Sequence, residues 1–231
     1  MRKIRKEERR IKTFLVLGSA FLLLFGLCGV AGATTINYNW VSALDGNGYT
    51  SPYSGVTVET FDAASLLWTW SGSKGIVTGS LSGTYAAPYG QSAPDATKYV
   101  TVPGNIGVGI EAEAALGDTY NYFGIWWGSV DTYNTLSFYN DGALVASFTG
   151  SQAITPSNGN GNQTAHSTNL YVNFLDLPDF NSFKMTSKQP AFEADNIAVG
   201  NVPVPAPEPS TMLLLGSGLL GLWGFRRKFK K

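Results

Sequence analysis

Acidic side chains occupy alternate positions of a short apolar segment near the end of the polar part of the chain. The segment Phe192–Val199 reads FEADNIAV, and its two acids, Glu193 and Asp195, are two residues apart. If the segment is a β-strand, both side chains point to the same face. Two carboxylates on one face are suited to Ca²⁺, which takes about six to eight oxygen ligands. The alternative is a pair of solvated acids at a strand end.

A second group of acids lies near the start of the domain. Glu59 and Asp62 belong to the segment VETFD. An acid in the closing strand paired with an acid near the first strand resembles the structural calcium site of jelly-roll carbohydrate-binding modules. The resemblance implies that Glu59 or Asp62 would join Glu193 and Asp195 as a metal ligand. Structural calcium is therefore the one cofactor that the sequence predicts.

Tryptophans are the second kind of candidate site, because sugar rings stack on exposed aromatic faces. Trp68 and Trp70 are two residues apart in an extended segment and share a face, whereas Trp126 and Trp127 are neighbours and face opposite ways. We expect carbohydrate binding through Trp68, Trp70 and Trp126. The alternative is that these rings pack the protein interior.

The strand that carries the tryptophan pair also indicates which of its faces is buried. Phe123, Ile125 and Trp127 fall on one face, and Tyr122 and Trp126 fall on the other. Phe123 and Ile125 are wholly apolar, so their face is predicted to be the core face. Trp127 is then the buried tryptophan, and Trp126 lies at the surface or at an interface.

Side chains that would support catalysis are few. The only histidine, His166, lies in the polar loop Thr155–Thr168. Glu111 and Glu113 would lie about 7 Å apart at their Cα atoms on one strand face, which is compatible with a glycosidase pair. They lack the third acid and the aromatic context of β-sandwich glucanases. We therefore predict no catalytic residue and no enzymatic activity, with a secreted polysaccharide hydrolase as the alternative.

The elements that hold these residues are predicted to be short strands. Gly, Ser, Thr, Asn, Tyr and Trp dominate, and apolar alternations are broken by turn residues every few positions. This favours an all-β, jelly-roll-like antiparallel β-sandwich over residues 34–200. Asn140–Gly142 predicts a hairpin turn, because Asp-Gly supplies positive φ angles. Strands are predicted at Gly55–Phe61, Ile76–Gly83, Lys98–Val102, Tyr120–Trp126, Thr135–Tyr139, Leu144–Thr149, Leu170–Phe174, Ser182–Ser187 and Phe192–Val199.

Residues 1–33 have the pattern of a secretory signal peptide with a helical apolar core. Met1–Lys12 carries seven basic residues, an apolar run follows, and small residues precede a cleavage position between Ala33 and Thr34. Signal peptidase is thus an expected partner, and an uncleaved anchor is the alternative. Cys28 is the only cysteine and lies in the apolar run, so the mature domain has no thiol or disulfide.

Charge is strongly segregated along the chain. Both ends are basic, whereas residues 34–209 contain four lysines against fourteen aspartates and glutamates. A basic block beside each apolar run places both ends on the cytoplasmic side of a membrane by the positive-inside rule. The acidic middle argues against nucleic acid as a partner.

Three blocks end the chain: a proline-rich linker at 201–209, an apolar run at Met212–Phe225, and a basic cluster. As a short helix the 14 apolar residues would reach about 21 Å, less than the ~30 Å core of a bilayer. The motif Pro207-Glu208-Pro209 before this run resembles the PEP-CTERM sorting signal, here residues 207–231. The internal segment YFGIWWGSVDTYNTLSFYNDG is also similar to a recurrent segment of exosortase-dependent surface proteins.

This resemblance implies how the protein is handled by the cell. Exosortase, a membrane-embedded cysteine enzyme, would process the tail at the Pro207-Glu208-Pro209 motif, so both termini would contact the membrane transiently. The expected destination is the cell surface or extracellular matrix of a Gram-negative bacterium, by way of an inner-membrane intermediate. The predicted function is that of a non-catalytic surface protein that holds exopolysaccharide in a biofilm matrix.

Overall fold

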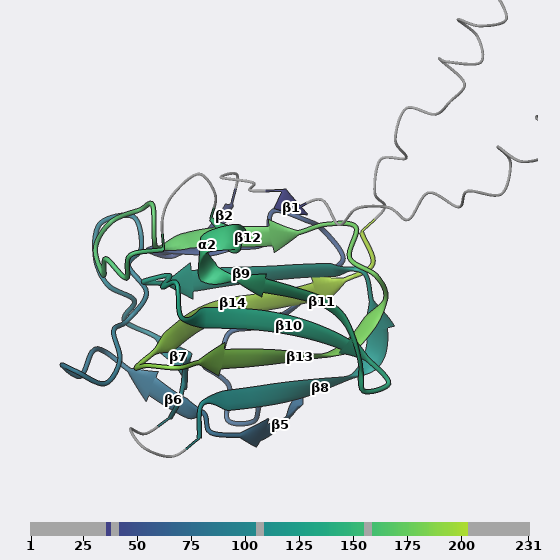
Figure 1. Cartoon of the computed structure of the whole chain (residues 1–231). Helices are drawn as coiled ribbons and strands as arrows, with labels where there is room; N and C mark the ends of the chain where they lie inside the picture. Colours follow the sequence, from purple (N-terminus) through teal and green to yellow (C-terminus); the bar gives the residue numbers. More distant parts are fainter. Residues whose placement is uncertain (1–35, 38–41, 105–108, 155–158, 203–231) are drawn as a thin grey trace, which may run out of the picture. The chain divides into compact units, whose positions relative to one another are not determined.

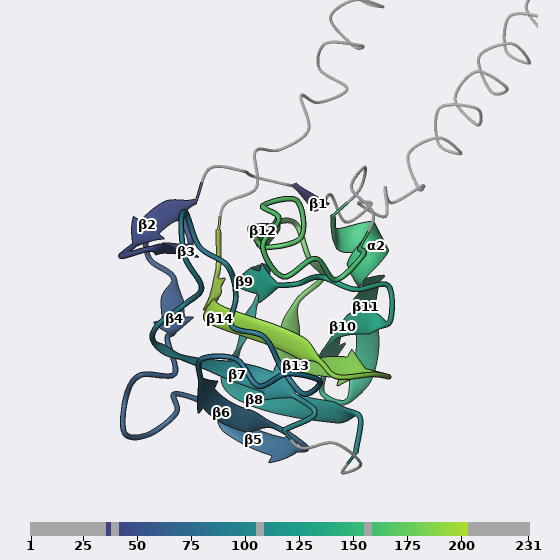
Figure 2. The same ribbon diagram turned by 90° about the vertical axis from the view of Figure 1, so that its left-hand side faces the viewer.

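A computed structural model describes residues 36–37, 42–104, 109–154 and 159–202 of the 231-residue chain, with the backbone alone for 36–37. The predicted signal peptide with its cleavage position at Ala33 and Thr34 lies outside these residues. So do the sorting motif Pro207-Glu208-Pro209 and the hydrophobic tail. Figures 1 and 2 show that the described strands form two facing layers. No helix among the described residues is long and apolar enough to cross a membrane.

The larger sheet has seven strands in the antiparallel order β1-β12-β9-β14-β7-β6, and β4 also pairs with β14. Its two central strands, β9 (Tyr122–Gly128) and β14 (Phe192–Gly200), are buried along their whole length. The remaining strands are β1 (Ile36–Asn37), β4 (Thr57–Glu59), β6 (Gly75–Thr78), β7 (Lys98–Val102) and β12 (Leu170–Phe174).

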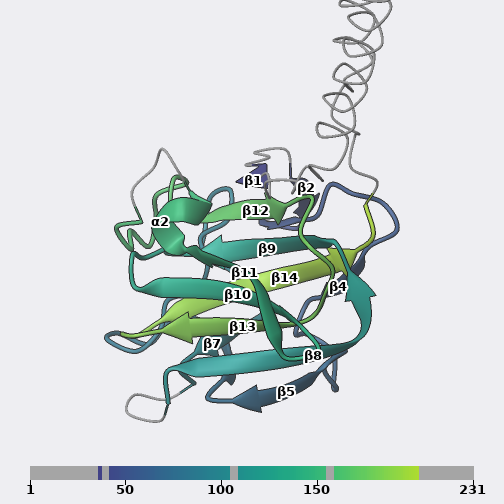
Figure 3. The same ribbon diagram turned by 45° about the vertical axis from the view of Figure 1, so that its right-hand side comes forward.

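The smaller sheet has five antiparallel strands in the order β11-β10-β13-β8-β5, which Figure 3 shows one beside the next. They are β5 (Thr69–Gly72), β8 (Glu111–Tyr120), β10 (Asn134–Asn140), β11 (Ala143–Thr149) and β13 (Phe180–Ser187). The predicted turn joins β10 to β11, with φ angles of 49° at Asp141 and 79° at Gly142. A single helical turn, α2 (Gly150–Ala153), follows β11.

One apolar core lies between the two sheets and confirms the predicted antiparallel sandwich. Phe123, Ile125 and Trp127 of β9 all face this core and are fully buried, as their alternation predicted. The ring of Phe123 meets Phe183 of the opposite sheet at a centroid distance of 4.8 Å. Trp127 stacks on Phe192, with ring centroids 4.2 Å apart and planes 6° apart.

The outer face of the larger sheet is also covered, which corrects the expectation for Trp126. This ring is only 1% exposed. A third, two-stranded sheet, β2 (Ala43–Asp45) with β3 (Gly48–Thr50), lies over it, and Tyr49 meets the ring edge-on at 5.8 Å. A Cβ at Gly48 would come within 2.4 Å of the indole, so glycine is required for this close approach.

A long connection, residues 79–97, covers a further part of the same outer face. Its backbone N–H groups at Ala86 and Tyr89 donate to Glu193 at 2.8 Å and to Asn169 at 3.0 Å. Both acceptors belong to or directly precede strands of the larger sheet. This connection therefore reaches across the sheet to the end at which β9 finishes and β14 begins.

Candidate functional site: a polar pocket at one end of the sandwich

Segments from distant parts of the chain enclose a polar pocket of about 290 Å³. Three walls are residues 83–85, 129–133 and 160–163, and the fourth is Pro190, Ala191 and Glu193. The antiparallel pairing explains why they meet: Gly128 at the end of β9 lies opposite Glu193 at the start of β14. The start of β10 likewise lies opposite the end of β13.

Glu193 forms a buried part of the pocket wall and is 2% exposed. Its Oε1 accepts the N–H of Ala86 at 2.8 Å, and its Oε2 accepts the hydroxyl of Ser129 at 2.8 Å. Burial raises the pKa of the Glu193 carboxyl to about 7, while these two hydrogen bonds act in the opposite direction. Through these two hydrogen bonds, Glu193 links the 79–97 connection to Ser129, which directly follows β9.

Asp131 is the second carboxylate of the pocket and is partly exposed. The chain turns sharply just before it, with a φ of 38° at Ser129. The hydroxyl of Tyr133 donates to Asp131 Oδ2, and Asn134 Oδ1 accepts the N–H of Asp131 at 3.0 Å. Burial is the main cause that raises the pKa of the Asp131 carboxyl, and the Tyr133 hydrogen bond opposes it.

Glycine is required where the 160–163 loop meets this carboxylate. Gly161 has a φ of 65°, and a Cβ there would come within 2.4 Å of Asp131 Oδ1. Its N–H donates to the backbone oxygen of Val130 at 3.1 Å. The loop is thus held closely against the carboxylate end of Asp131.

The chemistry of this pocket suits a neutral, hydroxyl-rich ligand. Carboxylates, tyrosines and side-chain amides line it, and the residues of the lining include neither lysine nor arginine. Such groups accept hydrogen bonds from hydroxyls and donate hydrogen bonds to them. None of them carries a positive charge that could pair with an anion. The lining polar residues are Thr84, Tyr85, Ser129, Asp131, Tyr133, Asn160, Gln163 and Glu193.

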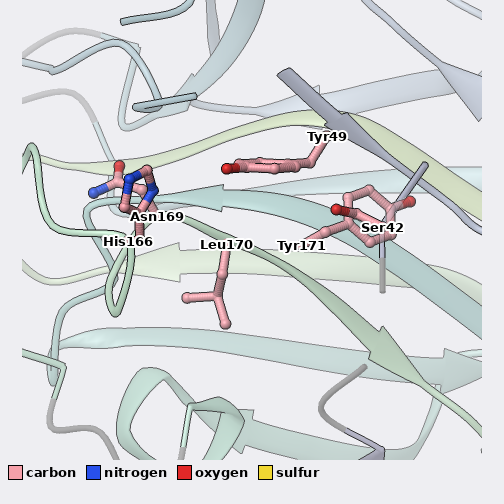
Figure 4. Close-up of a pocket in the computed structure, with 6 residues that line it drawn as sticks. All are labelled: Ser42, Tyr49, His166, Asn169, Leu170 and Tyr171. Atoms are coloured by element: carbon pink, nitrogen blue, oxygen red, sulfur yellow. The ribbon is translucent and has the colours of Figure 1, made fainter. Parts of the chain in front are cut away.

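A smaller pocket of about 90 Å³ lies beside the large one and is shown in Figure 4. Tyr49 and His166 stand on either side of it, with Leu170 below. Asn169 lines this small pocket, and its Oδ1 accepts the N–H of Ser129, which lines the large pocket, at 2.9 Å. His166, expected only as part of a polar loop, packs edge-on against Tyr89 at 5.9 Å.

The four acids predicted to share a calcium ion do not converge. The strand that holds VETFD does lie beside the last strand as expected, since β4 pairs with β14, although three short strands precede β4 in the chain. However, Glu59 lies opposite Ile197, which faces the core, whereas Glu193 and Asp195 point to the outer face. Among the described residues no group of three or more acids, histidines or cysteines is placed to hold a metal ion.

Glu59 and Asp62, the two predicted ligands from VETFD, each accept hydrogen bonds from backbone N–H groups. Glu59 is buried, and its carboxylate accepts the N–H groups of Phe61 at 2.9 Å and Leu67 at 2.6 Å. Asp62 accepts the N–H of Lys98 at 3.0 Å. Glu59 therefore stabilises the turn that follows β4 and is not available to an ion on the outer face.

Of the three tryptophans predicted to bind carbohydrate, Trp68 and Trp126 are buried and Trp70 is half-buried. Trp68 and Trp70 share a face as predicted, but both meet the core residue Phe183 edge-on, at 5.8 Å and 5.4 Å. Trp68 is 8% exposed, and Trp126 is covered by the β2–β3 hairpin. Trp68 and Trp126 therefore pack the interior, which is the alternative that the sequence left open.

Apart from Glu193, which was predicted as a metal ligand, the pocket residues were not predicted from the sequence. Asp131 and Tyr133 lie in SVDTYN, within the segment that resembles exosortase-dependent surface proteins, and residues 160–163 lie in the polar loop Thr155–Thr168. The sequence feature that could have indicated this site is the position of Asp131, three residues after the end of the buried strand β9. Loops at strand ends commonly carry binding groups on a rigid scaffold.

Together the two large sheets and the pocket define a β-sandwich with a polar site built by its end loops. Residues 205–228 match the family model of the PEP-CTERM protein-sorting motif. The chain thus carries this sorting motif in residues 205–228, and the motif implies export and surface localisation in Gram-negative bacteria. The search of the curated proteins found no match.

Several solved structures share part of this fold at low similarity. The catalytic domain of a GH87 alpha-1,3-glucanase in complex with nigerose is 18% identical, with a TM-score of 0.39. The catalytic unit of the thermostable GH87 alpha-1,3-glucanase from Streptomyces thermodiastaticus is 14% identical, with a TM-score of 0.34. The matches cover 71% and 67% of this chain but only 31% and 28% of those chains. At these scores the likeness does not bear on activity.

Proposed function

We propose that this chain is an exported surface protein that holds polysaccharide at the cell surface or in the extracellular matrix without cleaving it. Signal peptidase removes residues 1–33, and exosortase processes the tail at Pro207-Glu208-Pro209. Both termini contact the inner membrane only in transit. The observation that carries the proposal is the sorting motif at residues 205–228.

The polar pocket supports a sugar as the ligand of the sandwich domain. It combines hydrogen-bonding side chains with two tyrosines, Tyr85 and Tyr133, and it lacks basic residues. Binding sites with a few convergent polar groups in a concave surface are typical of small-ligand recognition. The acidic domain would stay soluble beside a neutral polysaccharide.

The hydrogen bonds of Glu193 favour binding over hydrolysis. Glycosidases use two carboxyl groups that both reach the scissile bond. Both oxygens of Glu193 already accept hydrogen bonds, from Ala86 and Ser129, and the residue is 2% exposed. Only Asp131 presents a partly exposed carboxylate to the pocket.

The second candidate is a secreted polysaccharide hydrolase, and one observation favours it. Asp131 and Glu193 line the same pocket, and burial raises the pKa of each carboxyl. Carboxyl groups with raised pKa values in one cleft are a feature of glycosidase active sites. Release of reducing ends from a bound polysaccharide, lost in Asp131→Asn, would establish this function in place of simple binding.

Processing at both ends gives the first prediction. Mass spectrometry of the surface-associated protein is expected to find Thr34 as its first residue and no peptide from the basic cluster 226–231. Glu208→Ala should leave the tail attached, whereas Pro203→Ala, outside the motif, should be processed normally. An intact Lys231 on the wild-type surface protein would contradict exosortase processing.

Polysaccharide binding gives the second prediction. On a glycan array, the full chain is expected to bind a neutral polysaccharide, and Asp131→Asn should weaken that binding roughly 10- to 150-fold. The reason is that a hydrogen bond to a charged group contributes about 1.5–3 kcal/mol. The dissociation constant can be measured by titration calorimetry with the polysaccharide that the array selects.

A matched control separates this effect from a general loss of charge. Asp118→Asn removes an exposed carboxylate near the end of β8. The pocket lies at the other end of the sandwich, where β8 starts opposite the end of β13. It is expected to bind like the wild type. Equal binding by Asp131→Asn and the wild type would place the sugar elsewhere on the domain.

A further inference from the structure

The smaller pocket of Figure 4 differs in chemistry from the large polar pocket. Two rings, those of Tyr49 and His166, stand on either side of it, and Leu170, which is buried, lies below. Concave sites that combine aromatic and apolar walls with a few polar groups are typical of small-ligand binding. The polysaccharide binding proposed above uses only the large pocket and leaves this one without a role.

Polar atoms on the walls of this small pocket are free to bind a ligand. Figure 4 shows the Tyr49 hydroxyl directed toward the side of the pocket on which His166 lies. Among the described residues, no side chain or backbone group forms a hydrogen bond with this hydroxyl or with the ring nitrogens of His166. A tyrosine hydroxyl and a neutral imidazole both donate and accept hydrogen bonds, so they suit a ligand that carries hydroxyl groups.

Contacts outside the pocket hold both rings in place. Tyr49 on β3 packs edge-on against Trp126 at 5.8 Å, and its backbone oxygen accepts the side-chain amide of Asn196 at 3.0 Å. His166 packs edge-on against Tyr89 at 5.9 Å. The two rings therefore do not have to be ordered when a ligand enters, and such preorganisation favours binding.

One loop lines both pockets. Part of the 160–163 segment lines the large pocket, whereas His166 and Asn169 line the small one. Asn169 Oδ1 accepts the N–H of Ser129, a residue of the large pocket, at 2.9 Å. Asn169 Nδ2 donates to the backbone oxygen of Asn162 at 2.8 Å. Both pockets therefore border one loop whose shape is fixed by its own hydrogen bonds.

We propose that the small pocket is a second sugar subsite, which holds one unit of a polysaccharide against Tyr49 and His166 while another unit of the same chain occupies the large pocket. A sugar ring suits this pocket, because its C–H face can pack on an aromatic ring and on Leu170 while its hydroxyls bond the Tyr49 hydroxyl. The inference rests on the proposed function and extends it: the domain recognises a segment of several sugar units and not a single sugar.

The first test is how the affinity depends on the length of the sugar chain. Neutral oligosaccharides, from single sugars to hexasaccharides, are prepared from the polysaccharide that the glycan array selects, and each is titrated calorimetrically into the full chain. An oligosaccharide that reaches both pockets is expected to bind about 100-fold more tightly than a single sugar, because its second contact is intramolecular. Equal affinities for the single sugar and the hexasaccharide would overturn the proposal.

The variant His166→Ala locates the second subsite. His166 is exposed, so its replacement should leave the fold unchanged. The variant is expected to bind the hexasaccharide roughly 2- to 12-fold more weakly, as for the loss of one aromatic contact, and the single sugar like the wild type. Asp131→Asn should instead weaken both. Ser167→Ala, an exposed neighbour that lines neither pocket, should weaken neither.

The results distinguish the second subsite from the proposed function on which it rests. If sugars of every length fail to bind, polysaccharide binding fails and the second subsite fails with it. If sugars bind and Asp131→Asn weakens them, but His166→Ala binds the hexasaccharide like the wild type or loses single sugars equally, only the second subsite is overturned.

Discussion

Replacing Trp127 by alanine is expected to lower the free energy of unfolding by about 3–5 kcal/mol, the range for a large aromatic residue in a core. The ring has no exposed surface, and it stacks on Phe192 with centroids 4.2 Å apart. Leu170 and Ala194 lie opposite Trp127 on the two neighbouring strands. The cavity would therefore open beside β9, which is held between β12 and β14 and cannot easily collapse into it.

Urea denaturation followed by circular dichroism would measure the loss. Leu144→Ala is the control, because Leu144 on the edge strand β11 is 59% exposed. It is expected to change the free energy of unfolding by less than about 0.5 kcal/mol. A loss below about 1 kcal/mol for Trp127→Ala would mean that this ring is not a core residue in solution.

The position of Trp127 illustrates what the sequence predicts well. Alternation along β9 places Phe123 and Ile125 on one face, and two wholly apolar side chains identify that face as the core. The same reasoning failed for Trp126 on the other face. A hairpin about 80 residues earlier in the chain, with Gly48 against the indole, covers that ring. No sequence pattern near Trp126 indicates that a hairpin so distant in the chain covers this ring.

The predicted calcium set shows a second limit. The expected closeness of the VETFD strand to the last strand was confirmed, because β4 pairs with β14. The expectation that Glu59 could share an ion with Asp195 does not fit the register, because Glu59 lies opposite the core residue Ile197 and is turned away from Asp195. The register shift at Asn196 adds to this effect by reversing the alternation within β14. A one-residue change of register moves the following side chains to the opposite face of the strand. The sequence alone does not indicate where such a change occurs.

The polar pocket could be predicted least, because four separate segments build it. Asp131 and Glu193 are 62 positions apart in the sequence, and only the pairing of Gly128 with Glu193 brings their strand ends together. Loop residues have no periodic pattern that would indicate their direction. Glu193 is the one residue of this pocket that the sequence singled out, and strand alternation predicted only that its side chain shares a face with that of Asp195.

Replacing Glu193 by alanine is expected to lower the free energy of unfolding by about 2–4 kcal/mol, because two donors lose their acceptor. The N–H of Ala86 is buried and donates to Oε1, and the hydroxyl of Ser129 donates to Oε2. A buried donor left without a partner costs about 1–3 kcal/mol. The 79–97 connection would also lose one of its hydrogen bonds to the larger sheet, so Tyr85 would be positioned less firmly and sugar binding should weaken.

Glu193→Gln separates the hydrogen bonds from the charge. Glutamine keeps an oxygen for the N–H of Ala86, and its amide can donate to Ser129 Oγ, since a hydroxyl both donates and accepts. We expect Glu193→Gln to retain sugar binding and to lose less than about 1 kcal/mol of unfolding free energy, because it also removes a buried charge. Chemical denaturation and calorimetric titration of both variants would measure the two effects. If Glu193→Gln were as unstable as Glu193→Ala, the carboxylate would be acting through its charge and not as an acceptor for the two donors.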